Sequence, residues 1–313
     1  MIRIGIISTA SYSLPLLQYL VNNRLQVSVF TDACSYDAKE FDCIIRYCKF
    51  AGVPVTNTSP DNLYKWLEQS QPQMVFIMGY RHLVDVKNIP PALVMHFYNI
   101  HFSSLPAFKG PMPVFWQIKN GVEYLGISIH RIDKKFDTGS LLWTKKIRRV
   151  SHLPFGMAHS ILASESIEGI IFLISHFIQR KELPIVKYDK KESSYYSRPS
   201  LRDVWINWDV MNADEIINLI NACNPWNKGA VTLYRDKEVK VIDAEIINTA
   251  VNNNLLSPGT IIADKNTLQV LCRKNKVISI NMLNLDGNFV PTRHADKFGF
   301  CKGKRLGGKL PGI

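Results

Sequence analysis

Polar residues with complementary chemistry lie near the middle of the chain. Asn99 and His101 are two positions apart after the apolar run 93–98, so a strand there would carry both side chains from its end on one face. Asp137 lies in a turn that Gly139 flanks, between two β-like runs. An amide N–H can polarise a carbonyl, an imidazole can take a proton, and a carboxylate can hold that imidazole. If the three groups meet, their chemistry is acyl transfer.

The same region carries a longer pattern, in which Asn-x-His-x-Ser-x-Leu-Pro-x-x-x-Gly is followed by Asp-Thr-Gly. This pattern resembles the signature of formyltransferases that use 10-formyltetrahydrofolate as co-substrate. The resemblance implies that Asn99, together with protonated His101, stabilises an oxyanion. It also implies that His101 and Asp137 move the amine proton to the leaving folate nitrogen. The match is carried by Asn99, His101, Ser103, Leu105, Pro106, Gly110, Asp137, Thr138 and Gly139.

The resemblance also implies binding residues and no metal. The loop 79–84 would line the folate pocket, largely through backbone groups on the pterin, and His82 has no catalytic role there. The implied folate-binding residues are Met78, Tyr80, His82, Leu83, Val84 and Asp133. The implied residues of the amine pocket are Ser103, Lys109, Pro111 and Met112.

Strands that alternate with helices should position these residues in an α/β, Rossmann-like domain with a parallel sheet. The predicted strands are 2–8, 25–31, a short one that starts with 53–55, 74–79, 93–98, 126–132 and 141–147. The main predicted helices are 38–50, 60–69, 114–120 and 157–180. The turn after the first strand has no Gly-x-Gly-x-x-Gly, which disfavours a dinucleotide-dependent dehydrogenase. His130, on the polar face of one strand, is expected at the surface.

A second, smaller domain is predicted after residue 200. A helix over 213–222, with Asn212 as its cap, precedes short β-like runs at 230–234, 239–247, 259–263, 267–271 and 277–283. These runs predict a small OB-like barrel. Their Trp, Asn-Pro-Trp, Pro-Gly-Thr and Gly-Lys-Arg-Leu motifs resemble the C-terminal domain of methionyl-tRNA and lipid-A-sugar formyltransferases. The expected division is a catalytic domain over 1–185, a linker over 186–203 and the barrel over 204–313.

Composition indicates a globular protein whose positive charge fits either a solvated basic surface or a phosphate-bearing ligand, with nucleic acid as a third interpretation. The chain has 313 residues, 46% hydrophobic and 20% charged, with a formal charge of +12. The cysteines lack a Cys-x-x-Cys pair, which favours free thiols over a metal site; they are Cys34, Cys43, Cys48, Cys223, Cys272 and Cys301. No apolar run approaches about 18 residues, so neither a membrane span nor a signal peptide is predicted. A cytoplasmic monomer or homodimer is expected.

The choice of acceptor depends on the segment after the second strand. Enzymes that formylate initiator methionyl-tRNA usually carry a basic Gly/Pro-rich insertion there, but here 32–41 holds one lysine among several acids and would repel phosphate. The motifs around Tyr80 and Asn120 also resemble the module that formylates nucleotide-linked 4-amino-4-deoxy-arabinose. We therefore predict a small, phosphate-bearing amine acceptor, first a nucleotide-linked amino sugar and next a natural-product amine.

Other activities remain as alternatives. The barrel and the positive charge are compatible with methionyl-tRNA formylation, which is the second prediction. A formyltetrahydrofolate hydrolase would use the same Asn, His and Asp, but the barrel domain argues against it. A non-enzymatic nucleic-acid binder would need aromatic residues interleaved with basic ones on a strand face, and the barrel strands offer little beyond Tyr234.

Overall fold

The computed structural model describes residues 1–32, 38–248 and 256–308, so the expectations about 33–37, Cys34 and Lys309 lie outside the described residues, as do those about the side chains of 38–41. The chain forms two compact units whose segments alternate along the sequence. The first unit contains Met1–Pro113, Tyr124–Ile147 and His159–Tyr196, and the second contains Val114–Glu123, Arg148–Ala158 and Ser197–Ile313. The predicted boundaries at 185 and 203 stay a prediction.

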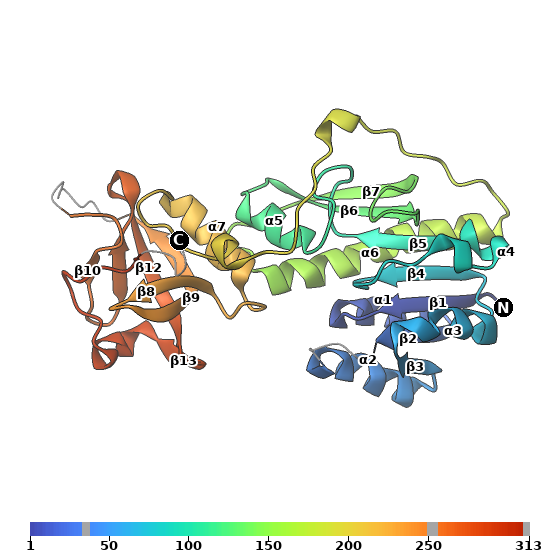
Figure 1. The fold of residues 1–313 in the computed structure, drawn as a ribbon, viewed down its shortest axis with the longest axis horizontal. Helices are drawn as coiled ribbons and strands as arrows, with labels where there is room; N and C mark the ends of the chain where they lie inside the picture. Colours follow the sequence, from blue (N-terminus) through green and yellow to red (C-terminus); the bar gives the residue numbers. More distant parts are fainter. Residues whose placement is uncertain (33–37, 249–255, 309–313) are drawn as a thin grey trace. The chain divides into compact units, whose positions relative to one another are not determined.

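A seven-stranded sheet forms the centre of the first unit (Figure 1). Its order is β3-β2-β1-β4-β5-β6-β7, in which the pairs from β3 through β5 are parallel and β6 is antiparallel to β5. This confirms the Rossmann-like α/β core. The strands are β1 Arg3–Ser8, β2 Gln26–Asp32, β3 Val55–Thr58, β4 Met74–Met78, β5 Phe97–His101, β6 Tyr124–Arg131 and β7 Leu141–Arg148.

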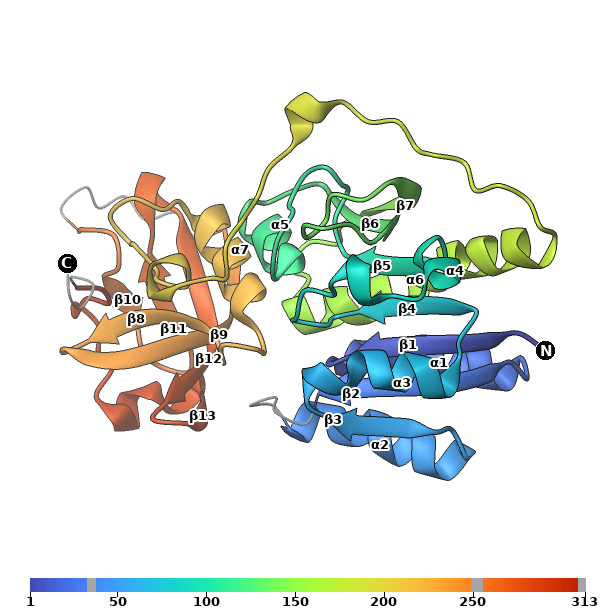
Figure 2. The same ribbon diagram turned by 45° about the vertical axis from the view of Figure 1, so that its right-hand side comes forward.

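The central strands are apolar because both of their faces are covered. Every residue of β4 is buried, and β1 is buried after Arg3. The helices that the structure gives for residues 1–180 are α1 Leu14–Asn22, α2 Ala38–Ala51, α3 Leu63–Ser70, α4 Pro91–Val94, α5 Pro113–Lys119 and α6 Phe155–Ile178 (Figure 2). Because the strands from β3 through β5 run parallel, their carboxyl ends lie at one edge of the sheet. Open α/β folds bind ligands at that edge.

The long helix α6 packs on the antiparallel strands. A Cβ at Gly169 would lie 2.5 Å from the Trp143 ring and 2.7 Å from Ile129, so only glycine permits this approach. Glu165 forms a 2.7 Å ion pair with Lys145 of β7. By length and composition alone, α6 is also the one helix of the described chain that could cross a membrane, with 39% of its apolar window buried in the protein. The absence of a membrane span stays a prediction.

The fifth strand begins later than the sequence predicted. Pro91, at the start of a helix, holds 91–94 in α4, so the apolar run 93–98 is divided between a helix and a strand. As a result, Asn99 and His101 lie inside β5 (Phe97–His101) rather than beyond its end. They still share one face of the strand, as period-two alternation requires.

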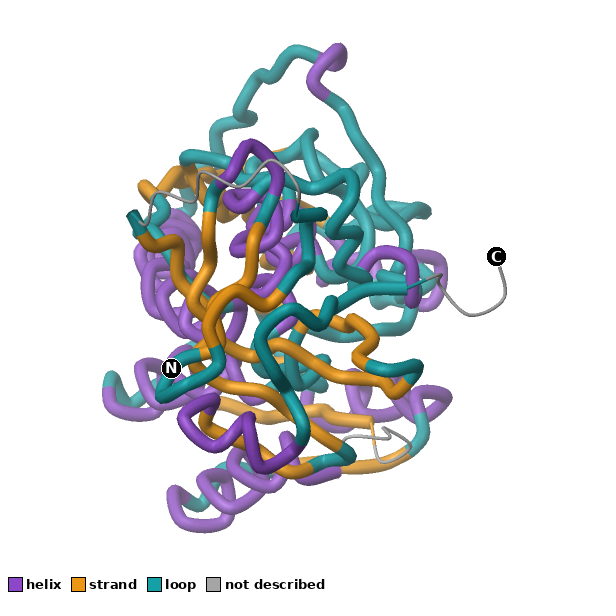
Figure 3. Tube along the Cα trace, turned by 90° about the vertical axis from the view of Figure 1, so that its left-hand side faces the viewer, coloured by secondary structure: helices purple, strands orange, loops and turns teal. Residues whose placement is uncertain are grey.

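The second unit contains α7 Ala213–Cys223 and an antiparallel sheet of order β10-β11-β12-β9-β8, with β13 beside β12 (Figure 3). Asn212 caps α7 as predicted, because its side chain accepts from the Glu215 N–H and Glu215 returns the bond. The strands are β8 Ala230–Tyr234, β9 Lys237–Ile247, β10 Ile261–Ala263, β11 Leu268–Leu271, β12 Val277–Leu285 and β13 Asn288–Pro291.

The sheet of the second unit curls, and a late segment joins its edges. Leu306 forms a bridge with Tyr234 of β8, and Arg305 forms one with Thr260, next to β10. A curled antiparallel sheet is therefore established, whereas the OB-like identity of the barrel stays a prediction.

Candidate active site

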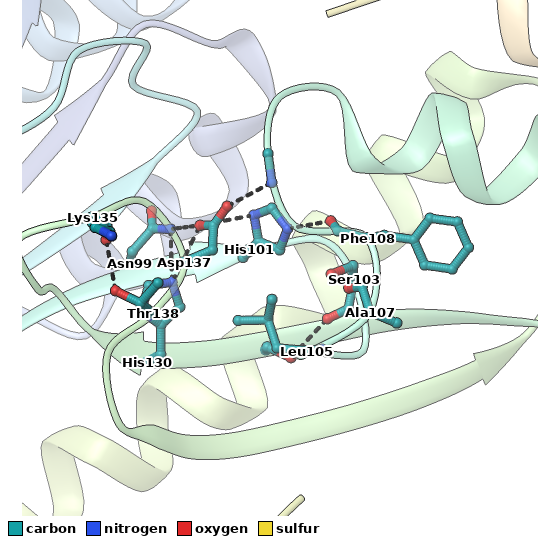
Figure 4. A network of polar contacts seen from close by, with 12 residues as sticks. Asn99, His101, Ser103, Leu105, Ala107, Phe108, His130, Lys135, Asp137 and Thr138 are labelled. Atoms are coloured by element: carbon teal, nitrogen blue, oxygen red, sulfur yellow. Dashed lines mark hydrogen bonds and ion pairs between the residues drawn. The ribbon is translucent and has the colours of Figure 1, made fainter. Parts of the chain in front are cut away.

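The predicted amide, imidazole and carboxylate meet at one oxygen atom (Figure 4). Asn99 Nδ2 donates to Asp137 Oδ1 at 3.3 Å, and His101 Nδ1 lies 3.4 Å from the same oxygen. His101 and Asp137 are only 7% and 8% exposed. Residues far apart in the chain thus form one buried polar cluster at the end of β5.

The turn before β7 holds the carboxylate in place. Asp137 has a φ of 55°, a left-handed conformation that aspartate tolerates better than most residues. The Thr138 hydroxyl donates to the Lys135 carbonyl at 3.1 Å and closes the turn. A Cβ at Gly139 would lie 1.8 Å from the Arg131 carbonyl oxygen, so this position requires glycine. The Asp-Thr-Gly motif therefore builds the turn as well as supplying the carboxylate.

The loop after β5 supplies a second support for Asp137. The Gly110 N–H donates to Asp137 Oδ2 at 2.9 Å. Gly110 has a φ of +96°, and a Cβ there would lie 2.2 Å from the Tyr196 carbonyl oxygen. The spacing from His101 to this glycine thus has a structural reason, because the backbone must approach both a carboxylate and a neighbouring segment.

The same loop fixes the tautomer of His101. His101 Nε2 lies 2.9 Å from the Phe108 carbonyl oxygen, which can only accept, so Nε2 carries a proton. In the neutral ring, Nδ1 then holds the lone pair on the side of Asp137. Nδ1 is therefore the nitrogen that can take a further proton, with a carboxylate 3.4 Å away to stabilise the cation.

His130 belongs to this cluster, and the expectation that it lies at the surface is wrong. It is 2% exposed, since the pairing of β5 with β6 sets it opposite Asn99. Its Nδ1 donates to the Arg131 carbonyl at 2.7 Å, which leaves Nε2 to accept from Asn99 Nδ2 at 3.1 Å. Sequence alternation alone could not show this, because burial of the polar face depends on strand register.

The electrostatics of the cluster favour an ionised carboxylate beside a neutral imidazole. Burial opposes ionisation of Asp137, but the protonated forms of His101 and His130, together with the Gly110 N–H, lower its pKa to about 2. Burial lowers the pKa of His101 below the usual 6.5, against the opposing effects of Asp137 and the Phe108 carbonyl. Near neutral pH the ring is therefore neutral and able to act as a base.

The predicted folate-binding residues differ in their exposure. Met78 and Val84 are buried, whereas Leu83 is 51% exposed. The Tyr80 hydroxyl is buried, and no hydrogen-bond partner for it occurs among the residues that the structure describes. Burial raises the pKa of Tyr80, so the hydroxyl keeps its proton and can donate to a ligand. Leu83 is thus the apolar residue of this set that is exposed, whereas Met78 and Val84 belong to the protein interior.

Two other residues predicted to bind the folate, His82 and Asp133, form hydrogen bonds within the protein. His82 Nε2 lies 2.7 Å from Asp32 Oδ2 at the end of β2. Asp133 is exposed and its carboxylate accepts from the Lys134 N–H at 2.7 Å. The structure shows no contact of either residue with the cluster around Asp137, and their roles stay predictions.

The predicted amine-pocket residues lie on the loop after β5. Ser103 is fully buried and its hydroxyl donates to the Ala107 carbonyl at 2.8 Å, so it closes the loop. The Lys109 backbone N–H donates to the Ser194 carbonyl. Pro111 and Met112 are half-buried. Direct contact of these residues with an acceptor stays a prediction.

Comparison with protein families gives two matches. A model described as "Formyl transferase" matches residues 17–153, and one described as "Formyl transferase, C-terminal domain" matches residues 200–291. A methionyl-tRNA formyltransferase of Clostridium novyi is 26% identical over 281 residues, covering 86% of this chain and 88% of the relative. The bifunctional polymyxin resistance protein ArnA of Wigglesworthia glossinidia brevipalpis is 27% identical over 270 residues, covering 81% of this chain and 38% of that protein.

Solved structures show the same fold. An N-formyltransferase from Helicobacter canadensis, in complex with folinic acid and dTDP-3-aminofucose, aligns with a TM-score of 0.70 and 20% identity over 90% of this chain and 99% of that one. HypX from Aquifex aeolicus, in complex with tetrahydrofolic acid, aligns with a TM-score of 0.68 and 15% identity over 94% of this chain and 46% of that one.

Proposed function

Because this chain belongs to the formyl transferase family, we propose that it is an N-formyltransferase that moves the formyl group of 10-formyltetrahydrofolate to the primary amine of a nucleotide-linked amino sugar. The observation that carries the chemistry is the meeting of Asn99, His101 and Asp137 at one carboxylate oxygen. An amide donor, a neutral base and an ionised carboxylate are the groups that acyl transfer to an amine needs.

The loop after β4 fits a folate. Leu83 offers exposed apolar surface, and the Tyr80 hydroxyl, which has no partner among the described residues, would offer a donor where a bound folate uncovers it. Such a mixture of apolar walls and a few polar atoms is typical of small-molecule sites. The folate supplies the formyl group, and these residues would hold it.

In the proposed reaction, Asn99 stabilises the negative charge that develops on the formyl oxygen when the amine attacks. Both hydrogens of its amide are used in the structure, by Asp137 and by His130. One of them must therefore turn to the substrate, which a single χ rotation allows. Removing one such donor typically costs about 10²–10³ in rate.

His101 takes the proton that the attacking amine loses. The proton is received at Nδ1, because Nε2–H donates to the Phe108 carbonyl. Asp137 then lies 3.4 Å from the new cation and stabilises it until the proton passes to the leaving nitrogen. Asp137 keeps its charge throughout, since its own pKa is about 2.

The acceptor proposal is supported by sequence and by likeness. The segment after β2 carries acids where a tRNA-binding insertion would be basic, and the structure of the Helicobacter canadensis enzyme holds a nucleotide-linked amino sugar. The alternative is formylation of initiator methionyl-tRNA, which the similarity to the Clostridium novyi enzyme over most of both chains favours.

The test is a formylation assay with 10-formyltetrahydrofolate and separate acceptors. The purified chain is offered dTDP- and UDP-linked amino sugars and initiator methionyl-tRNA, and the mass increase of each acceptor is measured. We expect formylation of an amino sugar. Formylation of the tRNA alone would replace our acceptor by the alternative. If Asn99→Ala, His101→Ala and Asp137→Ala each retained full activity, the catalytic assignment would be wrong.

A further inference from the structure

A segment far along the chain pairs with the loop that carries the site. The Lys109 N–H donates to the Ser194 carbonyl, and the Tyr196 N–H donates to the Lys109 carbonyl, both at 2.9 Å. Lys109 and Tyr195 thus form a parallel β-bridge. We call residues 194–196 the bracing segment; it follows the short helix Lys190–Glu192 within the same compact unit (Figure 1).

Side chains reinforce this pairing. The Ser194 hydroxyl accepts from the Phe108 N–H at 2.9 Å, and the Ser194 N–H donates to the Pro106 carbonyl at 3.2 Å. The rings of Phe108 and Tyr196 stack with centroids 5.3 Å apart and planes at 11°. The loop is therefore held by backbone, hydroxyl and ring contacts together.

The geometry of the loop connects the bracing segment to the catalytic cluster. In an extended backbone, the N–H and C=O of one residue point to one side, while the preceding C=O and the following N–H point to the other. Lys109 turns both groups to the bracing segment. Consequently the Phe108 C=O and the Gly110 N–H face the opposite side, where they bind His101 Nε2 and Asp137 Oδ2.

We propose that Ser194 is a positioning residue of the formyltransferase, which acts through the loop 106–110 to hold His101 and Asp137 in their reactive arrangement. The inference rests on the catalytic roles proposed above. Ser194 touches neither reacting group itself. Its carbonyl secures the peptide unit whose opposite side carries the Phe108 contact, and its hydroxyl holds the preceding peptide unit through the Phe108 N–H. The Tyr196 N–H, two residues further on, secures the peptide unit that carries the Gly110 contact.

The direction of the effect follows from these contacts. The Phe108 carbonyl raises the pKa of His101, and the Gly110 N–H lowers that of Asp137. A looser loop weakens both bonds, so the imidazole becomes harder to protonate and less well oriented. We therefore expect Ser194→Ala to lower kcat about tenfold, because small misplacements of catalytic groups cost up to about 10²-fold. KM for the folate should change little, and the acid limb of kcat/KM should move to lower pH.

Matched variants separate positioning from general stability. Ser194→Thr keeps a hydroxyl and should restore kcat and the pH profile. Ser193→Ala removes the neighbouring exposed hydroxyl, for which no contact with the loop is found among the described residues, and should behave as wild type. Each variant is assayed below its thermal unfolding midpoint. The proposal is overturned if Ser194→Ala matches Ser193→Ala in kcat and pH profile, or if it loses only thermal stability.

A second measurement does not depend on the acceptor. ¹⁵N NMR of the imidazoles reports the tautomer and titration of His101, whose signals are identified by their loss in His101→Gln. In the wild type we expect the Nε2–H form, and in Ser194→Ala a mixture of tautomers and a lower midpoint. Identical spectra would overturn the positioning role. The expected change in the spectra together with an inactive wild type would instead count against the proposed function, so the two failures differ.

Discussion

Asp32 and Asp137 of the first unit each lie beside a histidine, and the two pairs that they form with His82 and His101 differ in what surrounds them. His82 lies 2.7 Å from Asp32, whereas His101 lies 3.4 Å from Asp137. The shorter pair has a buried carboxylate, but its imidazole is 38% exposed. In the longer pair both side chains are buried, and Asn99, His130 and the Gly110 N–H also converge on the carboxylate.

The difference shows that a short contact does not mark a catalytic pair. An ion pair that water reaches contributes little, because solvent screens its charges. In a buried pair surrounded by fixed hydrogen-bond donors, the electrostatic interactions are stronger, and the groups need not reorient when charge develops during a reaction. The comparison therefore supports the proposed catalytic role of Asp137 and His101, and we propose a binding or structural role for Asp32 and His82.

The largest expected effect is that of Asp137→Asn. The amide leaves the protonated His101 without its counter-charge and changes the bond to Gly110, so we expect kcat to fall about 10³–10⁴-fold. Asp32→Asn is the matched change in the other pair and should leave kcat close to wild type. Steady-state kinetics with a saturating acceptor measure both. Equal losses in the two variants would contradict the comparison.

Asn99→Ala should have the next largest effect, a loss of about 10²–10³ in kcat, because it removes the donor to the developing oxyanion. KM for the folate should stay within a small factor, since the amide acts on the transition state. A rise in KM with constant kcat would show that Asn99 binds substrate rather than stabilising charge.

The pH profile should separate the two histidines. Since burial lowers the pKa of His101, its neutral, basic form persists below pH 6.5. Activity should therefore be constant around neutrality and fall only as the pH drops below 6.5 and the ring gains its proton. The measurement is kcat/KM from pH 4.5 to 8. His82→Ala should keep the same acid limb of the pH profile. A shift of that limb in His82→Ala would show that the pair of His82 and Asp32 contributes to it.

The smallest catalytic effect is expected for His130→Gln. Glutamine can still accept a hydrogen bond from Asn99, so we expect a loss of about tenfold or less, the scale of one neutral hydrogen bond. His130→Ala, which leaves the Asn99 N–H without this acceptor, should lose more. If both variants matched the wild type, His130 would have no part in orienting Asn99.

Local sequence signals were sufficient for most elements. The Asn212 capping box begins α7 as predicted, and the alternating residues 230–234 form β8 as predicted. The Asn-x-His and Asp-Thr-Gly motifs also identified a cluster that the structure brings together. The start of β5 was placed too early, since an apolar run alone does not distinguish a helical turn from a strand.

By itself, the sequence determined which side chains could do the chemistry and where the chain would turn, because residue type and short spacing control both. Only the tertiary structure decided that His130 joins Asn99 and that 194–196 supports the loop 106–110, because strand register and backbone pairing act between residues far apart in the chain. Such contacts have no local signal: their free energy exists only once the distant segments have come together.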